Sequence, residues 1–406
     1  MIEQTGSANF PPTRAEALRR LAAFVPRAGA AYSAGRNFDL GPGRREAVSN
    51  LSPYLRYRLI TEREVTAAVH DRHSPEAAEK FVQEVVWRTY WKGWLEARPE
   101  AWTRFQADRD AVRDGLTGGL AKAVQAAEAG LTGIEGFDDW ALELVETGYL
   151  HNHARLWFAS IWIFTLRLPW VLGADFFLRH LVDADPASNT LSWRWVAGLQ
   201  TRGKTYLATT ENIERYTEGR FAPRGLAREA PALSEPPLPA ARRLDALSPG
   251  RADAAALLLM TPDDLDPSSL VVANAKVGGI VAITGATGWP WGKAAQAFVH
   301  AAVDDAATRA SAHFNAPATI IAGFDADTIV AAAEQAGASE IITPEAPVGP
   351  IADDLSRLAP RLAAAGLSMV RRRRAWDERF WPHATKGFFA LRERIGDVLA
   401  EDGLPA

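Results

Sequence analysis

The sequence predicts two domains of different class, an all-α domain over residues 1–222 and a doubly wound parallel α/β domain over residues 251–406. A chain of 406 residues favours two domains over one. Apolar residues recur three and four positions apart in the first part, whereas short apolar runs alternate with helical stretches in the second. Residues 223–250 carry six prolines, which predict a linker because proline interrupts helices and central strands.

The all-α prediction rests on helical periodicity over residues 15–24, 78–95, 140–145 and 149–166. The most apolar run, 156–166, is 11 residues long, and a membrane-spanning helix needs about 20. It therefore predicts a buried core helix rather than a membrane span. Because the first residues also lack the basic and apolar segments of a signal peptide, we expect a cytoplasmic protein.

The α/β prediction rests on four strand-like runs, 256–260, 280–283, 318–324 and 340–344. Helical stretches at 293–314, 325–336 and 351–365 connect or follow them. The glycine-rich segment after the second run is open to two interpretations, a dinucleotide-binding turn or a plain tight turn, since its glycines miss the usual spacing. The four arginines 371–374 indicate either a strand edge or solvated turn, or a contact to an anionic ligand.

Composition excludes several function classes. A formal net charge of -4 argues against a nonspecific nucleic-acid binder driven by charge, although a local basic groove stays open. The chain has no cysteine, which excludes disulfides, thiolate metal sites and cysteine nucleophiles. His151 and His153 diverge on a helix, so we expect no metal site. The chain has 14 tryptophans but only 7 tyrosines. A stripe of tryptophans along a helix is consistent with a plain helical core.

Polar residues within the apolar helices of residues 147–198 are harder to explain by a core alone. Asn152 and Leu156 are four residues apart and share one helix face. Arg155, if buried, needs a carboxylate, for which Asp183 and Asp185 are the candidates. Buried polar groups cost free energy unless they are hydrogen-bonded, and a polar, planar cofactor would satisfy these.

Several motifs in order resemble the FAD-binding helical domain of the photolyase/cryptochrome family over residues 15–200. They are YSAGRN from Tyr32, VSNLSPYLRYRLIT over 48–61, FVQEVVWRTYW over 81–91, TGYLHNHARLW from residue 147, LVDADPASN from residue 181 and SWRWVAG from residue 192. The resemblance implies FAD as the cofactor. It implies that Tyr32, Ser49, Leu51 and Ser52 hold the phosphates and ribitol.

The resemblance also implies roles around the flavin ring. Arg155 and Asp183 match a salt-bridged pair beside the ring, Asp185 matches a partner of the ring edge, and Asn189 matches the residue facing flavin N5. The full set of implied FAD-binding residues is Tyr32, Ser49, Asn50, Leu51, Ser52, Glu84, Arg88, Arg155, Asp183, Asp185, Asn189 and Trp193.

Light-driven chemistry in the family uses an electron path and a substrate pocket. Trp193 and Trp170 match the proximal and middle members of the path, while the distal member lacks a match; Trp102, Trp157, Trp162 or a tyrosine are alternatives. The implied catalytic residues are Glu84, Trp193, Trp170 and Asn189. The implied substrate-binding residues are Trp87, Asn152, His153, Leu156 and Trp195. Glu84 and Arg88 are also spaced for a local ion pair.

Departures from the family pattern bear on which function the resemblance implies. His153 and Leu156 replace the usual arginine and methionine, and the segment after Gly198 differs. Residues 253–395 resemble the family's antenna-type α/β domain, placed after the FAD domain instead of before it, and imply a second antenna chromophore of unknown identity. The resemblance implies a photolyase-like lyase that transfers an electron from reduced FAD to a pyrimidine dimer in DNA. The alternatives are a cryptochrome-like light sensor with a signalling partner and a FAD protein without a light role.

Overall fold

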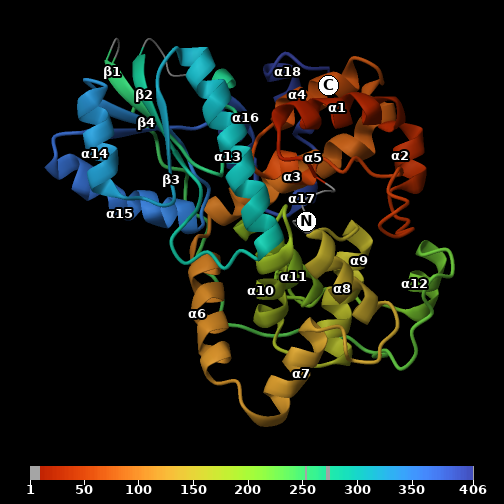
Figure 1. The fold of residues 1–406 in the computed structure, drawn as a ribbon. Helices are drawn as coiled ribbons and strands as arrows, with labels where there is room; N and C mark the ends of the chain where they lie inside the picture. The colour runs from red at the N-terminus through yellow and green to blue at the C-terminus, as the bar shows by residue number, and fades with distance from the viewer. Residues whose placement is uncertain (1–9, 252–253, 271–274, 406) are drawn as a thin grey trace, which may run out of the picture.

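The computed structural model describes residues 10–251, 254–270 and 275–405. Before residue 222 the described chain is helical and contains no strand, which confirms the all-α prediction for this part (Figure 1). Its α-helices are α1 (Arg14–Phe24), α2 (Ala30–Gly35), α3 (Ser52–Arg56), α4 (Glu62–His70), α5 (Pro75–Glu96), α6 (Glu100–Asp114), α7 (Gly118–Glu128), α8 (Phe137–Thr147), α9 (Asn152–Ser160), α10 (Trp170–His180), α11 (Pro186–Val196) and α12 (Thr210–Tyr216). None of the helices in the described part of the chain is long and apolar enough to cross a bilayer.

Local sequence signals set the starts of the helices that later form the site. Thr61 and Glu64 form a reciprocal capping box at α4. Ser74 caps α5 and Pro75 occupies its first turn, where the missing N–H has no helical partner to lose. Asp185 caps α11 in the same way, with its side chain accepting from the Ser188 N–H at 2.8 Å.

The predicted helix over 149–166 is interrupted in the structure. α9 ends at Ser160, and the chain continues as a π-helical turn over Ile161–Thr165. The Leu166 N–H bonds the Ile161 carbonyl, five residues back, and the Trp162 indole donates to the Pro169 carbonyl at 3.0 Å. The wider turn lets the large apolar side chains of this run pack in the core, a use typical of π-turns.

The second part contains a five-stranded parallel sheet of order β3-β2-β1-β4-β5. Its strands are β1 (Ala255–Met260), β2 (Lys276–Ile283), β3 (Ala318–Ile321), β4 (Glu340–Pro344) and β5 (Ser368–Arg372), and its connecting helices are α13 (Lys293–Phe314), α14 (Ala326–Gln335) and α15 (Pro350–Ala364). This confirms a doubly wound α/β sheet: β2 and β3 are added on one side of β1, and β4 and β5 on the other, so the order of the strands reverses between β1 and β4. For the region of β5, the sequence analysis offered a strand edge only as one interpretation of the arginines 371–374.

Side chains alternate across the sheet. Leu258 and Ile280 face α13 and belong to the same buried cluster as the helical part, whereas Leu257 and Val281 face α14 and α15. One core therefore runs from the sheet into the helices, and the figure shows α13 between the sheet and the helical bundle (Figure 1).

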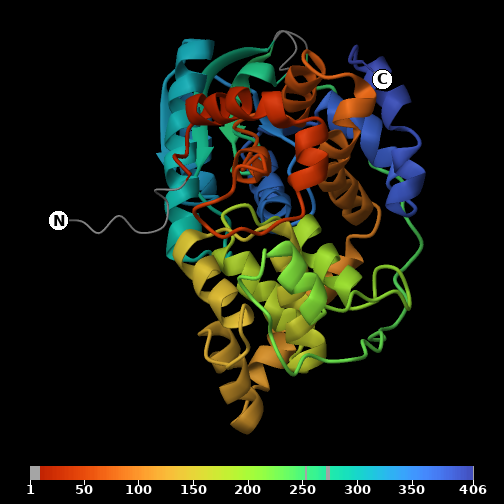
Figure 2. The ribbon, with the colours of Figure 1, turned by 90° about the vertical axis from the view of Figure 1, so that its right-hand side faces the viewer.

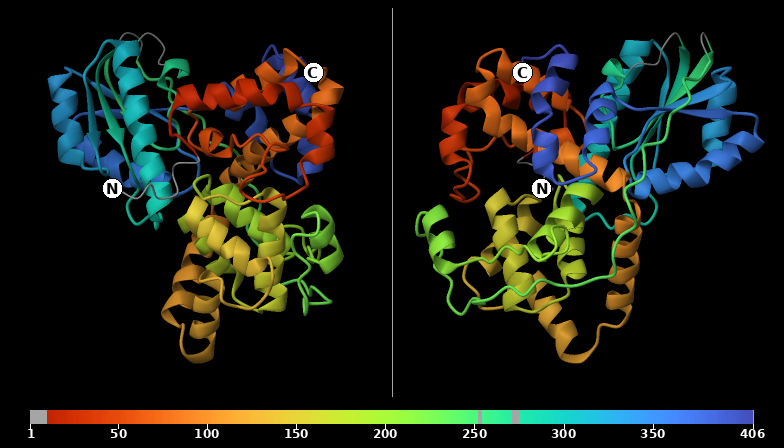
Figure 3. Two further views of the ribbon diagram at one scale, coloured as in Figure 1. Left: turned by 45° about the vertical axis from the view of Figure 1, so that its right-hand side comes forward. Right: turned by 180° about the vertical axis from the view of Figure 1, so that it is seen from behind.

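The proline-rich segment 223–250 has no helix or strand, as predicted. It lies along the helical part, where the Leu233 N–H bonds the Ala197 carbonyl at 3.0 Å and the Arg242 N–H bonds the Ala97 carbonyl at 2.9 Å. After β5 the chain returns to the helical part as α16 (Ala375–Phe380), α17 (Phe388–Arg392) and α18 (Ile395–Glu401), which lie beside α1–α5 (Figures 2 and 3). The domain boundary at residue 251 stays a prediction.

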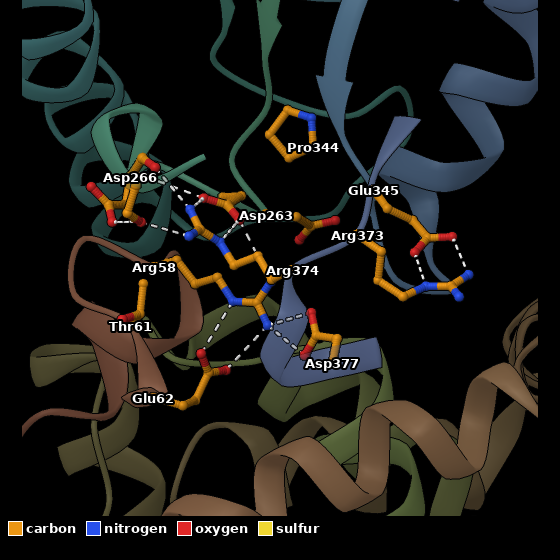
Figure 4. Close-up of polar contacts among 12 residues, drawn as sticks. Arg58, Thr61, Glu62, Asp263, Asp266, Pro344, Glu345, Arg373, Arg374 and Asp377 are labelled. Carbon is orange, nitrogen blue, oxygen red and sulfur yellow. Dashed lines mark hydrogen bonds and ion pairs between the residues drawn. The ribbon is translucent and has the colours of Figure 1, made fainter. Parts of the chain in front are cut away.

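A buried ionic network joins the two parts. Arg58 of the turn before α4 contacts Glu62 at 3.2 Å and Asp377 of α16 at 2.7 Å (Figure 4). Arg56 pairs with Asp263, and Arg374 pairs with Asp264, both in the loop after β1. The arginine run therefore makes internal ion pairs at this junction, and Arg373 likewise pairs with Glu345.

Candidate functional site

A cavity of about 500 Å³ lies between α2, α3 and α5 on one side and α9, α10 and α11 on the other. It is mainly apolar with polar groups at a few points, as in small-molecule sites of this size. Fifteen of the residues predicted for the site line it: Tyr32, Ser49, Asn50, Ser52, Glu84, Trp87, Arg88, Asn152, Arg155, Leu156, Asp183, Asp185, Asn189, Trp193 and Trp195. The structure thus brings together residues up to 163 positions apart in the chain.

Three predicted residues lie elsewhere. His153 is next to Asn152 on α9, and one step of a helix turns its ring away, where Nδ1 lies 2.8 Å from the Asn37 carbonyl and the ring stacks on Trp157. His153 is therefore absent from the cavity lining, and its predicted contact with substrate stays a prediction. Leu51 is fully buried at the start of α3, outside the cavity lining. Trp170 begins α10 and contacts Phe105 at a ring distance of 5.7 Å.

Arg155 and Asp183 form the charged pair on which the site is built. The Arg155 guanidinium meets an Asp183 carboxylate oxygen at 2.9 Å, and its Nε donates to the Leu150 carbonyl at 3.0 Å. Asp183 is buried, and although burial alone would raise the pKa of its carboxyl, the Arg155 charge and hydrogen bond leave that pKa below its usual value. A fixed negative charge beside a fixed positive charge is thus held at the cavity wall.

Asp185 and Arg88 form a second pair. The Asp185 carboxylate caps α11 and contacts the Arg88 guanidinium. Burial opposes the charged form, but the Arg88, Lys92 and Arg56 charges lower the pKa of Asp185. Arg88 is thereby engaged away from Glu84, so the alternative of a local Glu84–Arg88 ion pair is not the arrangement found.

Glu84 has a different environment. It pairs with Arg36 at 3.6 Å, and its side chain lines the cavity. Burial raises its pKa, and the Arg36 charge offsets this only in part. The carboxyl is therefore available for a hydrogen bond to a molecule bound in the cavity.

Asn189 and Trp193 are one helical turn apart on α11 and both line the cavity. The Asn189 amide nitrogen donates to the Ala174 carbonyl at 2.8 Å, which leaves the amide oxygen as its free group. The Trp193 ring is buried and contacts Trp162 edge to face at 6.3 Å. Trp102 and Trp170 both contact Phe105, at 5.4 and 5.7 Å.

Four buried polar atoms of the cavity wall have no hydrogen-bond partner among the described residues. They are Asn50 Oδ1, Asp183 Oδ1, Ser188 Oγ and Trp193 Nε1. Such atoms cost free energy unless a ligand or water satisfies them. A mainly apolar cavity with two fixed ion pairs and unsatisfied donors and acceptors fits a large, planar, polar cofactor such as a flavin.

One residue of the lining was missed from the sequence. Phe389 of α17 borders the cavity although it lies 305 residues after Glu84. Its neighbour Phe388 stacks on Trp87, with ring centroids 3.5 Å apart. The double phenylalanine in KGFFALRERI was the available signal, but only the tertiary fold shows where it lies.

A second, smaller cavity of about 130 Å³ lies where the loop after β2 meets α6 and α15. In this loop the Thr287 N–H donates to the Asp354 carboxylate at 2.7 Å, so this backbone donor is already satisfied by a side chain of the protein. The second antenna chromophore stays a prediction.

The fold and the cavity together indicate a helical domain that binds a small molecule. Residues 81–222 match the family described as the FAD binding domain of DNA photolyase. The chain is 34% identical over 157 residues to a deoxyribodipyrimidine photo-lyase of Streptomyces griseus, covering 38% of this chain and 33% of that protein. It is 35% identical over 195 residues to one of Agrobacterium fabrum, covering 47% and 39%. A solved bacterial class III photolyase from Agrobacterium tumefaciens gives a TM-score of 0.43 at 28% identity, over 51% of this chain and 43% of that one.

Residues 81–222 are thus similar to the FAD-binding domain of DNA photolyases, and the curated relatives that match this chain are named deoxyribodipyrimidine photo-lyases. The chain matches between a third and two fifths of the length of these two curated relatives.

Proposed function

We propose that this protein is a photolyase-like lyase that uses FAD and blue light to split UV-induced pyrimidine dimers in DNA. The observation that supports this most is the sharing of one cavity. Arg155 and Asn189, implied for the flavin, and Glu84 and Asn152, implied for the dimer, line the same space. A donor and an acceptor of electrons would be held in contact there, away from bulk water.

When bound, FAD supplies light-driven, reversible one-electron transfer. The chain would hold it with the Arg155–Asp183 pair, the Asp185 and Asn189 side chains, and the hydroxyl and amide groups of Ser49, Asn50 and Ser52. The Asn189 oxygen is free to accept a hydrogen bond. Arg155 is the cation that would stabilise added negative charge next to the ring.

On the substrate side, a protonated Glu84 would donate a hydrogen bond to a carbonyl of the dimer, and Asn152 would contact its polar edge. Trp195 presents an aromatic face on which an extrahelical base can stack. Leu156 would exclude water from the contact. Arg202 and Lys204, exposed in the loop after α11, are placed to meet phosphates.

We propose Trp193 as the first electron donor in the photoreduction of the flavin. Trp170 is the next member that the resemblance implies, and Trp162 is the tryptophan in ring contact with Trp193. Blue-light photoreduction in the presence of a reductant should be lost in Trp193→Phe. Comparing Trp170→Phe with Trp162→Phe identifies the second member, because replacing that residue slows photoreduction while replacing the other does not.

The deciding experiment measures light-dependent repair of an oligonucleotide that carries a single pyrimidine dimer, using the full chain with reduced FAD. We expect repair under blue light and none in the dark. Glu84→Ala should lower the repair yield, whereas Glu79→Ala, exposed on the same helix, serves as the matched control. Efficient photoreduction with no repair by the fully reduced protein would refute the enzyme and favour the light sensor.

A further inference from the structure

The mouth of the cavity carries an aromatic side chain from the far end of the chain. Phe389 lines the cavity, yet 69% of its surface is exposed. Phe388 beside it is buried and lies parallel to the Trp87 ring, with an angle of 11° between the planes. One face of Trp87 is thus already covered by the protein itself, while the adjacent phenylalanine is open.

α17 is held in place by its surroundings rather than loosely attached. The Tyr90 hydroxyl donates to the Lys386 carbonyl at 2.9 Å, and the Arg98 guanidinium donates to the Thr385 carbonyl at 2.8 Å. Phe388 also meets Tyr90 edge to face at 5.5 Å. Phe389 is therefore presented by a fixed frame on α5, the helix that also carries Glu84.

The charges around Phe389 indicate what kind of ligand it meets. The Arg392 guanidinium lies 5.2 Å from the centre of the Phe389 ring, and both Arg392 and Lys386 are exposed. Glu393 is exposed on the same turn, and Arg394 pairs with Asp397 at 2.9 Å. An open aromatic face with cations next to it is the combination that binds nucleotides, because the ring stacks on a base and the cation meets a phosphate.

We propose that Phe389 stacks on a nucleobase of damaged DNA at the cavity mouth, with Arg392 beside the adjoining phosphate. α17 is then part of the DNA-binding surface, and Phe389 takes the stacking role on the side where Phe388 covers Trp87. This inference rests on the proposed function, and it adds a contact from the C-terminal segment to the site in the helical part.

The test measures binding in the dark, by fluorescence anisotropy, of a labelled single-stranded oligothymidylate before and after UV irradiation. The variants of the FAD-loaded full chain are Phe389→Ala and Phe389→Trp. Leu131→Ala, a change of a 75% exposed leucine remote from the cavity, is the matched control. The flavin content of each variant, measured by absorbance, reports whether the cavity is intact.

We expect Phe389→Ala to weaken binding of the irradiated oligonucleotide about tenfold, with unchanged flavin content. Phe389→Trp should restore it, and Leu131→Ala should bind as the unaltered protein does. Arg392→Gln should reduce the salt dependence of binding by about one phosphate contact. If the unaltered protein prefers irradiated DNA and Phe389→Ala binds it equally well, the inference fails and the proposed function stands. If the unaltered protein shows no such preference, both fail.

Discussion

Arg155 is the residue on which the charge of the site depends most directly. Replacing it in Arg155→Gln removes the cation 2.9 Å from Asp183 and leaves a buried carboxylate at the cavity wall. Charged hydrogen bonds contribute about 1.5–3 kcal/mol, so we expect FAD affinity to fall at least tenfold. Flavin retained per protein after gel filtration measures this.

The control for that change is Arg19→Gln, which breaks an exposed pair with Glu16 on α1. It should retain flavin as the unaltered protein does. Equal flavin retention in both variants would contradict the role assigned to the Arg155–Asp183 pair, because the two changes differ chiefly in burial and in distance from the cavity.

Glu96 at the end of α5 makes stability depend on pH. It accepts a hydrogen bond from the Val348 N–H of the α/β part, and burial raises the pKa of its carboxyl to about 7 from an ordinary value of 4.5. The unfolded chain therefore releases this proton at lower pH than the folded chain does. Between those two pKa values the free energy of unfolding falls as pH rises, by up to about 3 kcal/mol, and then levels off.

Glu96→Gln keeps an acceptor for the Val348 N–H but cannot ionise, so its side chain resembles the neutral carboxyl at every pH. We expect urea unfolding of the variant to lose less stability between about pH 5 and about pH 8 than the unaltered protein does. Parallel losses in the two proteins would show that other groups set the pH dependence.

Among the elements, α10 and α11 are fitted to each other at Gly173. A Cβ atom there would lie 2.3 Å from Cη2 of Trp193 and 3.0 Å from Cδ2 of Trp162. Both rings are buried, so neither can move away freely. Gly173→Ala should lower the free energy of unfolding by about 1–3 kcal/mol despite alanine's higher helix propensity.

The same variant should also retain less flavin, since Trp193 lines the cavity. Gly119→Ala is the matched control, because it lies on α7 with no atom within 4 Å of the added Cβ. We expect it to be neutral or slightly stabilising. Thermal unfolding and flavin absorbance of the two variants measure both effects, and an undisturbed Gly173→Ala would contradict the close packing of α10 on α11.

How far sequence predicts structure differs from element to element. The helix predicted at 293–314 matches α13 (Lys293–Phe314), because its apolar stripe and the left-handed Asn315 at its end are local signals. β5 was missed as a full strand because it is short, half-exposed and ends in arginines. The π-turn at Ile161–Thr165 was missed because its apolar run also fits an uninterrupted helix.

Site residues that belong to one sequence motif could be predicted, whereas those that come from distant segments of the chain could not. Asn152 and Leu156, or Asn189 and Trp193, share a face because they are one helical turn apart, and the structure confirms both pairs at the cavity. His153 lies outside the cavity lining because, as the neighbour of Asn152, it takes another face of α9, which motif matching does not show. Phe389 could not be assigned to the site because its approach depends on how α17 docks on α5.

At the scale of the whole molecule, the carboxyl ends of β1 and β4 are where open α/β sheets usually bind ligands. Here the loop after β1 meets arginines instead: Arg56 with Asp263, and Arg374 with Asp264. Arg58 adds contacts to Glu62 and to Asp377, 319 residues away (Figure 4). The loop after β1 at this edge of the sheet is thus used to attach the helical part.

Arg58→Met tests this attachment. The Arg58 side chain is 2% exposed, and its removal leaves Glu62 and Asp377 as buried carboxylates without their main cation. Breaking a buried pair from one side costs about 3–5 kcal/mol. We expect a large fall in the midpoint of thermal unfolding and a split of the single transition into two, because the helical part and the sheet lose the contact that couples them.

Arg361→Gln provides the comparison, since Arg361 pairs with Asp327 at 3.1 Å on the surface, where both side chains are exposed. Such a pair contributes at most about 1 kcal/mol, and the single transition should persist. Calorimetry at matched flavin content distinguishes the two. One cooperative transition in Arg58→Met, at a midpoint close to that of Arg361→Gln, would mean that the shared apolar core around α13 and not the ionic network couples the sheet to the helices.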